Sequence, residues 1–543
     1  MSAAPVSVNR YDLAWAAALP ALALLLMRPA LSAFYYADDY FFVAMARGLA
    51  SPLDFFTTGH FFGNYLYRPL PLSLWWLIER LDGGARLQYA ANALLLGACG
   101  AALFWLLREL GWRRQTALPA SALFILLPGN LGTALWLADR FDLMAVPLLF
   151  AAAALWLRHA RSGDGHSARR SLACFLLAAL SKELSYMFPL LMAVVLVLKW
   201  RDWPREAAAP RRRLLALVAG YALIVFGLLA WRAHLGIALN APDHGNGALA
   251  PLLAGALKWW RALPAALAYA RAPADEVPAG LAVLLALTLA ALGVAAWRRS
   301  RRLEEGGARR AGLALGGAIL LLAPLVQAPH LAISNMEFAA VDGTQSGMFA
   351  ERFFFFGSAG LLLFLANGLA VFYPPRGPAK LFAAAGALAA CALVAFWSVG
   401  RDAVLAAHWP VRSGVSHRTA TLAAEAARRL APEVGVPCRL RFLGSGDAVF
   451  QVESEAMVKV IAADARVDRC IVETETPPMF TLTHPAALPW YRLPAPDAQA
   501  LGIARIAGWI IMPGGQAGLA LAPAATQELH LAGAAGFVAG GRP

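Results

Sequence analysis

The sequence has few charged residues for its length. Asp, Glu, Lys and Arg make up 15% of its 543 residues, whereas 60% are hydrophobic. A soluble globular protein of this length does not need so much apolar surface, so that class is excluded. Several nearly uncharged runs are about 20 residues long, enough to cross a hydrocarbon core of about 30 Å. The composition predicts a polytopic membrane protein with helical spans, because lipid offers backbone groups no hydrogen-bond partner.

Several short motifs that mark common sites are missing. The sequence contains no HExxH, no CxxC, no Walker loop and no GxGxxG in a βαβ setting. It also shows no internal repeat, which argues against a transporter built from two matching halves. The first apolar run, residues 14–31, lacks a clear small-residue cleavage site, so we interpret it as a retained span rather than a signal peptide.

The net charge of +14 is carried mainly by arginines in short segments between the apolar runs. This is the positive-inside pattern, which orients a membrane protein and does not indicate a nucleic-acid partner. The pattern predicts a multi-pass protein of the inner (cytoplasmic) membrane, with a cytoplasmic N-terminus and an extracytoplasmic (periplasmic) C-terminal domain. The clusters lie at residues 113–114, 169–170, 211–213 and 298–302.

The charge rule predicts about eleven spans within residues 1–400, with a long first outer loop at residues 32–88. The apolar pieces of that loop are short and rich in aromatic residues, which suits helices lying in the interface. As one helix, the run 171–199 would place the next basic stretch outside. We therefore expect a break at Ser181, with Lys182 and Glu183 at an outer turn.

From about residue 401 the composition becomes that of a soluble domain, predicted to be a small extracytoplasmic α/β domain over residues 401–543. Residues 439–444 and 470–475 have the pattern of strands, and residues 453–465 have that of a helix between them. Cys438 and Cys470 each begin one of these segments. A disulfide between them is permitted outside the cytoplasm, and two free thiols are equally compatible with the sequence.

Nine charged residues lie at the outer ends of spans or beside apolar runs. Ionisable groups at membrane depth are costly and tend to mark functional sites. A carboxylate there can accept a proton from a nucleophile, and Arg or Lys can hold a phosphate leaving group. The residues are Asp38, Asp39, Arg68, Arg140, Asp142, Lys182, Glu183, Glu351 and Arg352.

Structural roles are the alternative for these residues. Asp38 could cap a helix that starts at Tyr40. Sequence neighbours could also form ion pairs that let loops enter the interface. Those pairs would be Arg140 with Asp142, Lys182 with Glu183, and Glu351 with Arg352.

Five short motifs in order resemble the GT-C superfamily of polytopic glycosyltransferases, which carry an acidic motif in the first outer loop. The likeness is strongest to the membrane region of transmembrane O-mannosyltransferases that bear tetratricopeptide repeats, and it extends to about residue 400. Two departures are the absence of a tetratricopeptide period and the absence of the family's histidines, where this chain has Tyr89, Asn92 and Leu96. The motifs are ADDY, YRPL, WLADRFDL, LSKE and AERFFFFGS.

The resemblance implies a polyprenyl-phosphate-linked sugar donor at the outer leaflet and an inverting transfer to an acceptor hydroxyl on a glycan, lipid or protein. It implies that Asp38 is the base and that Asp39 orients the acceptor or holds a metal, so a divalent cation is the cofactor left open. Arg68, Arg140, Lys182 and Arg352 would neutralise the phosphate, and Asp142, Glu183 and Glu351 complete the predicted substrate site. Three alternatives remain: a transporter or flippase of lipid-linked glycans, an O-antigen ligase or polymerase, and an inactive scaffold.

Overall fold

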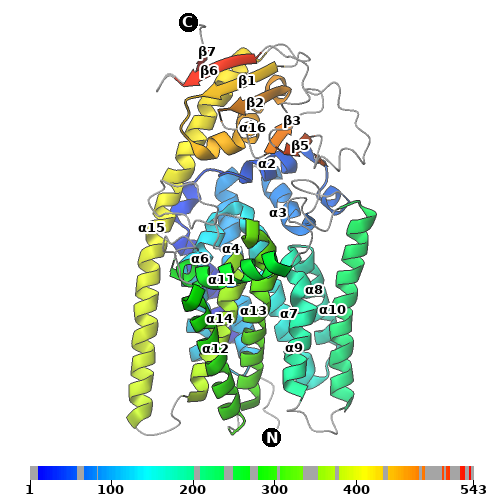
Figure 1. Ribbon diagram of the computed structural model, residues 1–543, viewed down its shortest axis with the longest axis vertical. Helices are drawn as coiled ribbons and strands as arrows, with labels where there is room; N and C mark the ends of the chain where they lie inside the picture. The colour runs from blue at the N-terminus through cyan, green and yellow to red at the C-terminus, as the bar shows by residue number, and fades with distance from the viewer. Residues whose placement is uncertain are drawn as a thin grey trace. The chain divides into compact units, whose positions relative to one another are not determined.

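The computed structural model divides the chain into two compact units (Figure 1). The first unit comprises Met1–Arg28, Ala90–Gly227 and His244–Ala407, and the second comprises Pro29–Tyr89, Leu228–Asp243 and His408–Pro543. The predicted domain boundary near residue 400 remains a prediction. The structure describes residues 10–57, 66–81, 84–200, 208–237, 249–268, 279–302, 306–333, 352–372, 378–431, 438–475, 480–483, 504–506, 509–513, 526–531 and 537–539.

The described part of the first unit is helical. Its elements are α1 (Arg10–Leu26), α4 (Gly84–Glu109), α5 (Arg114–Leu126), α6 (Pro128–Leu135), η3 (Leu137–Asp139), α7 (Arg140–Ser162), α8 (Gly165–Ala179), η4 (Glu183–Met187), α9 (Phe188–Trp200), α10 (Ala208–His234), α11 (Leu249–Ala268), α12 (Ala279–Ser300), α13 (Gly306–Ile333), α14 (Arg352–Phe372) and α15 (Pro378–Leu430), of which α4, α10 and α15 run on into the second unit.

Six of the described helices are long and apolar enough to cross a membrane, namely α4, α7, α10, α12, α13 and α14. A seventh span results if α5 and α6, which are bent by 55° at their junction, are taken together. The apolar parts of α1 and α9 are shorter than the roughly 20 residues that a straight span needs. The described helices thus support a multi-pass membrane protein, and the count of eleven spans remains a prediction.

The expected break after residue 180 is confirmed. Helix α8 ends at Ala179, and the 3₁₀ turn η4 starts at Glu183. Between them Lys182 has extended backbone dihedrals, φ −160° and ψ 142°, which cannot continue a helix. The Oγ of Ser181 donates to the carbonyl of Leu177, 2.8 Å away, and so satisfies one of the free groups at the helix end.

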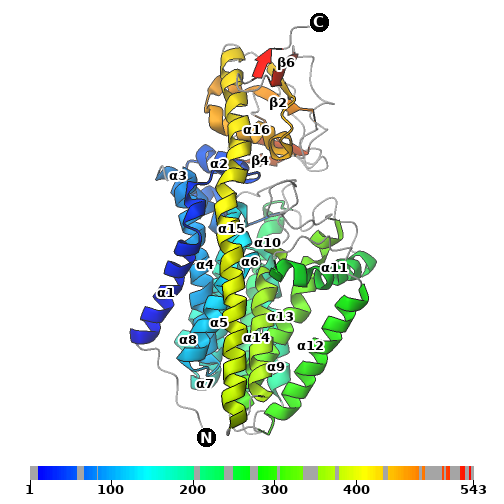
Figure 2. The same ribbon diagram turned by 90° about the vertical axis from the view of Figure 1, so that its left-hand side faces the viewer.

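Small residues bring helices of the first unit close together. Helices α12, α13 and α14 lie side by side in both views (Figures 1 and 2). A Cβ on Gly316 of α13 would stand 2.5 Å from the backbone nitrogen of Phe364 in α14. A Cβ on Gly360 would stand 2.5 Å from the side chain of Ile319. The two backbones can approach this closely because glycine occupies the contact, as is common between membrane helices.

The last helix runs across the predicted domain boundary near residue 401. Helix α15 is one helix of 53 residues, roughly 80 Å long at about 1.5 Å per residue (Figure 2). Pro410 lies inside it without ending it. The helical backbone thus continues across the predicted boundary even though Pro410 donates no backbone hydrogen bond.

The second unit combines short helices with two sheets. Its helices are η1 (Pro29–Ser32), α2 (Asp39–Gly48), η2 (Pro52–Phe56), α3 (Pro69–Arg80), α16 (Ala448–Ala462) and α17 (Ala465–Asp468). Its strands are β1 (Cys438–Leu443), β2 (Cys470–Thr474), β3 (Phe480–Thr483), β4 (Ala504–Ile506), β5 (Trp509–Pro513), β6 (Thr526–Leu531) and β7 (Phe537–Ala539).

The predicted β-α-β order is confirmed. Strands β1 and β2 pair in parallel with α16 between them in the chain, within a sheet of order β2-β1-β6-β7. Strands β3, β5 and β4 form a separate antiparallel sheet. Cys438 and Cys470 are register partners, and a disulfide joins them, which resolves the choice that the sequence left open. Helix α16 packs on β2 and β3, and also on α2.

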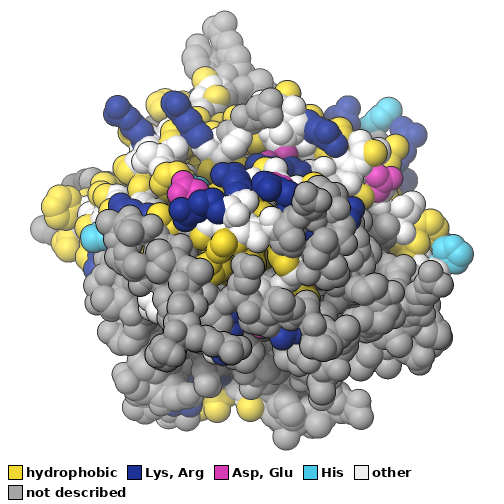
Figure 3. Space-filling view, turned by 90° about the horizontal axis from the view of Figure 1, so that it is seen from above, with side chains coloured by type: hydrophobic (Ala, Val, Ile, Leu, Met, Phe, Trp, Pro, Cys, Tyr) yellow, Lys and Arg dark blue, Asp and Glu magenta, His cyan; other side chains and the backbone are white. Residues whose placement is uncertain are grey.

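Among the residues that the structure describes in the second unit, three acidic side chains are buried. Figure 3 shows a face of the molecule on which Lys and Arg side chains are spread, whereas Asp and Glu side chains show at few places. The carboxyl groups of Asp39, Glu453 and Glu455 are on residues that are at most 4% exposed. Buried carboxyl groups need specific hydrogen-bond partners, so they point to where the chemistry of this unit is concentrated.

Candidate functional site

The adjacent acids Asp38 and Asp39 lie at the start of α2. Asp38 occupies the N-cap position, yet its side chain forms no capping hydrogen bond, and its backbone is helical with φ −52° and ψ −20°. The capping interpretation is therefore wrong for its carboxylate. Ala37, just before it, has φ +48°, a left-handed conformation that costs energy for a residue with a Cβ. This turn sends the two neighbouring acids in different directions.

Asp39 is fully buried and serves the backbone of the turn. Its Oδ2 accepts a hydrogen bond from the N–H of Tyr36 at 2.9 Å. A buried carboxylate is stable only when such donors replace water. We conclude that Asp39 holds the turn in shape and positions its neighbour.

The carboxylate of Asp38 meets a second carboxyl group, that of Glu453 on α16. Glu453 is 4% exposed and is hydrogen-bonded to Asp38. Burial, and then the negative charge of Asp38, raise the pKa of Glu453 well above its usual range. Both effects favour the neutral form of Glu453, which can donate to the carboxylate of Asp38. The helix that carries Glu453 was predicted from the sequence, but this contact was not.

Aromatic and basic side chains from the end of α15 surround the acidic turn. The Nε of Arg412 donates to the hydroxyl of Tyr36 at 2.9 Å, and its guanidinium lies 5.1 Å from the centre of that ring. The His417 ring stacks on Phe34 with 4.0 Å between centroids, and its Nδ1 lies 3.2 Å from the hydroxyl of Tyr40. Burial lowers the pKa of His417, which favours its neutral form. These contacts were not predicted.

Arg68, a predicted phosphate ligand, lies in this unit at the N-cap of α3.

Glu79, near the end of α3, forms hydrogen bonds with residues of three other segments. Its Oε1 accepts from the hydroxyl of Tyr35 at 2.5 Å and from Gln88 at 3.1 Å, and its Oε2 accepts from Arg47 at 3.2 Å. Glu79 thus links α2, α3 and the start of α4 into one support for the acidic turn.

A second polar group lies in the first unit, at the start of α7. Arg140 is fully buried there, and its Nε donates to the Oδ1 of Asn92 at 2.8 Å. The Nδ2 of Asn92 donates in turn to the carbonyl of Ala134 at 3.1 Å. Asn92 was noted in the sequence only as a departure from a family pattern, whereas the structure gives it the role of orienting Arg140.

Lys182 forms an ion pair with Asp142 of α7. The side chain of Lys182 is 11% exposed, and that of Asp142 is 0% exposed. The Oδ1 of Asp142 has no hydrogen-bond partner in the described part of the chain. Glu183 is half-buried at the start of η4.

Arg352 pairs with Asp139, a residue that the sequence analysis did not single out. The Nη1 of Arg352 lies 3.4 Å from the Oδ1 of Asp139. Its guanidinium stands 4.4 Å from the ring centre of Trp136 and 4.8 Å from that of Phe353, within the range of cation–π attraction. Glu351, its proposed partner, lies outside the described residues.

The start of α7 thus brings together all three predicted cations of the first unit. Asp139, Arg140 and Asp142 fall within four positions of the chain, and their partners bring Arg352, Asn92 and Lys182 to that turn. Guanidinium and ammonium groups held in this way suit a phosphate ligand. The residues described by the structure contain no group of three or more His, Cys, Asp or Glu side chains that could hold a metal, so the divalent cation remains a prediction.

Neither a protein-family model nor a curated protein sequence matches this chain. Among solved structures, it is similar to the archaeal oligosaccharyltransferase AglB from Archaeoglobus fulgidus in complex with an inhibitory peptide and a dolichol-phosphate. That match has 11% identity and a TM-score of 0.48, and it covers 84% of this chain and 64% of the other. The chain thus spans less than two thirds of that protein's length.

A second similar structure is ArnT from Cupriavidus metallidurans bound to undecaprenyl phosphate. The identity is 16% and the TM-score 0.37, with 94% of this chain and 99% of the other covered. At TM-scores below 0.5 these likenesses carry no weight for function. The finer resemblance to O-mannosyltransferases is not tested by them and remains a prediction.

Proposed function

We propose that this protein is a membrane glycosyltransferase that moves a sugar from a polyprenyl-phosphate-linked donor to an acceptor hydroxyl at the outer face of the membrane. The observation that carries the proposal is the state of Asp38. Its side chain is not engaged in capping, and neutral Glu453 donates to it, which favours its ionised form. A general base must be unprotonated and within reach of a hydroxyl proton.

The reaction would be a single displacement. The acceptor hydroxyl gives its proton to Asp38 as its oxygen forms a bond to the anomeric carbon. The bond between that carbon and the phosphate oxygen breaks, and the polyprenyl phosphate leaves with the electron pair. Because the oxygen attacks from the opposite side, the anomeric configuration inverts. Arg140, Lys182 and Arg352 would neutralise the departing phosphate, and Arg68 is a further candidate for that role.

The direct test is transfer by the full-length protein in liposomes supplied with a polyprenyl-phosphate donor whose sugar is radiolabelled. We expect labelled acceptor and free polyprenyl phosphate in equal amounts. A flippase of lipid-linked glycans would move the donor between leaflets without cleaving it. Donor that crosses the bilayer intact, with no labelled product for any hydroxyl acceptor tried, would reject the proposal in favour of that alternative.

The proposed orientation can be tested with reporter fusions. The positive-inside rule predicts that fusions after Arg114, Arg170, Arg213 and Arg310 report the cytoplasm, whereas a fusion after Pro432 reports the outside. The measurement is paired activity of a reporter active only in the cytoplasm and one active only outside. A cytoplasmic signal at Pro432 would contradict the placement of the acids at the outer face.

The hydrogen bond between Glu453 and Asp38 predicts a pH dependence. The pKa of Glu453 is raised in the folded state, so its contribution to stability is fully present below its unfolded pKa of about 4.3. That contribution is lost as the pH rises through the folded pKa. Glu453→Gln should remove this loss, because a neutral amide can also donate to Asp38.

Thermal unfolding of the wild type and Glu453→Gln across neutral and alkaline pH measures this effect. Glu425→Gln, an exposed change on α15 with the same loss of charge, is the matched control and should follow the wild type. Identical pH profiles for all three proteins would show that Glu453 does not hold the proton.

A further inference from the structure

The turn between α7 and α8 adjoins a small cavity that the proposed reaction does not use. Its volume is about 160 Å³, and it is lined by His159, Arg161, Ser162 and Gly163 from the end of α7 and by Arg213 and Leu214 from α10. The basic residues at this end of the helices predict that it faces the cytoplasm.

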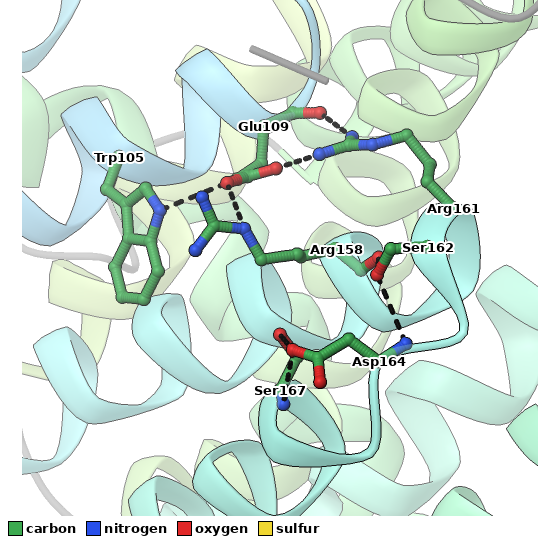
Figure 4. Close-up of polar contacts among 7 residues, drawn as sticks. All are labelled: Trp105, Glu109, Arg158, Arg161, Ser162, Asp164 and Ser167. Atoms are coloured by element: carbon green, nitrogen blue, oxygen red, sulfur yellow. Dashed lines mark hydrogen bonds and ion pairs between the residues drawn. The ribbon is translucent and has the colours of Figure 1, made fainter. Parts of the chain in front are cut away.

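One wall of the cavity is positively charged through Arg161, which pairs with a carboxylate outside the lining, that of Glu109. Figure 4 shows Arg158 and Arg161 reaching Glu109 from α7. Arg161 donates both to the side chain and to the main-chain carbonyl of Glu109, and the Nε of Arg158 lies 3.4 Å from Oε1. Trp105 also donates to Oε1, at 3.2 Å. Glu109 is thus occupied, and one carboxylate faces two guanidinium groups.

Arg213 supplies the opposite wall. Its Nη1 lies 2.7 Å from the position that a Cβ on Gly163 would occupy, so the guanidinium rests directly on the turn. Gly163 has φ +68°, which glycine adopts without strain. Arg213 is exposed and forms no hydrogen bond or ion pair with the residues that the structure describes. Its donors are therefore available to a ligand.

The backbone groups beside the cavity are already satisfied. Asp164 caps α8, accepting hydrogen bonds from the backbone N–H groups of His166 at 2.9 Å and Ser167 at 3.1 Å. The Nδ1 of His159 donates to the carbonyl of Asp164 at 2.8 Å. Helix N-termini often bind anions through free backbone N–H groups, but at the start of α8 Asp164 already accepts from them. A ligand in this cavity would therefore be held by side chains.

We propose that this cavity binds a phosphate group, carried by an anionic lipid headgroup or free in solution, with Arg213 and Arg161 as its cationic walls. Planar guanidinium groups match phosphate oxygens in charge and geometry. Basic pockets between helices at the cytoplasmic side of a membrane are suited to lipid headgroups. The cavity is well below the roughly 300 Å³ of pockets for larger ligands, which favours a single phosphate group. The proposal does not depend on glycosyl transfer.

The test is ligand binding to the purified full-length protein in a neutral detergent, followed by native mass spectrometry and thermal unfolding. The probes are dioctanoyl phosphatidylglycerol, dioctanoyl phosphatidylcholine and inorganic phosphate. We expect phosphatidylglycerol to bind and to raise the unfolding temperature. Arg213→Gln should weaken its binding roughly tenfold, as expected for a charged hydrogen bond. Arg212→Gln, which removes the same charge from the neighbouring exposed residue but does not line the cavity, should leave binding unchanged.

The probes separate the two sources of phosphate. Binding of inorganic phosphate as tight as that of phosphatidylglycerol, with the same loss in Arg213→Gln, assigns the cavity to free phosphate. Tighter binding of phosphatidylglycerol assigns it to a lipid headgroup. Equal effects of Arg213→Gln and Arg212→Gln would overturn the proposal, because they would reflect total charge. So would phosphatidylcholine binding as tightly as phosphatidylglycerol, or no binding by any probe.

Discussion

Asp38→Asn is expected to lower sugar transfer by about 10²–10⁴-fold, the usual contribution of a general base. The amide keeps the size of the carboxylate and can still accept a hydrogen bond from Glu453, but it cannot take a proton from the acceptor. Folding and membrane insertion should be normal, because the Asp38 side chain forms no capping bond that the amide would lose. The measurement is transfer from a polyprenyl-phosphate donor in membranes, normalised to the amount of protein.

Two further substitutions calibrate that result. Asp54→Asn makes the same chemical change in the same unit, where Asp54 accepts from the N–H of Ser51 at 3.2 Å, and it should retain transfer. Asp39→Asn should fall between the two, since Asp39 shapes the turn through its hydrogen bond with the N–H of Tyr36. Near-normal transfer by Asp38→Asn would reject its assignment as base. Near-normal transfer by both Asp38→Asn and Asp39→Asn would reject a carboxylate base altogether.

Lys182→Met is expected to lower the free energy of unfolding by about 3–5 kcal/mol, because it leaves the charge of Asp142 buried without its partner. Methionine has a similar length and can fill the same space, so the loss would come from charge rather than from a cavity. Removing this cation should also weaken binding of the donor phosphate. Denaturant unfolding in detergent and the KM for donor measure the two effects separately.

The double variant Asp142→Asn/Lys182→Met tests whether the loss of stability comes from an unpaired buried charge. With both charges removed, the stability should recover to within about 1–2 kcal/mol of the wild type, because replacing a whole buried pair is far less costly than breaking it. Donor binding should stay weak, since the cation is still missing. If the double variant were as unstable as Lys182→Met, the ion pair would not be what holds these residues in place.

Local features of the fold followed from the sequence where one physical rule decided them. The break between α8 and α9 followed from the charge rule, because an unbroken helix would have moved a basic cluster across the membrane. The two parallel strands and α16 followed from their hydrophobic periods. The number of membrane spans could not be predicted from the sequence in the same way. Two of the apolar runs form helices shorter than a straight span, and sequence hydropathy does not reveal where a helix bends, as it does between α5 and α6.

The charged residues of the candidate site were found, but most of their partners were not. Pairing Arg140 with Asp142 was wrong because residues two apart on a helix point to different sides. The actual partners, Asn92 and Lys182, come from other elements. Glu453 was missed for a similar reason, since only the packing of α16 on α2 brings it to Asp38. The one sign of this contact in the sequence was a glutamate on the buried face of a predicted helix.

The bond between Cys438 and Cys470 closes α16 into a covalent ring, since the two cysteines are 32 positions apart and the helix lies between them. In the entropic account of cross-links, closing a ring of that size lowers the conformational entropy of the unfolded chain. This raises the free energy of unfolding by roughly 4 kcal/mol. The helix that carries Glu453 is thus tethered at both ends, and only an oxidising compartment can make the tether. Chains retained in a reducing compartment would lack the disulfide. The position of Glu453, the partner of Asp38, would then depend on packing alone.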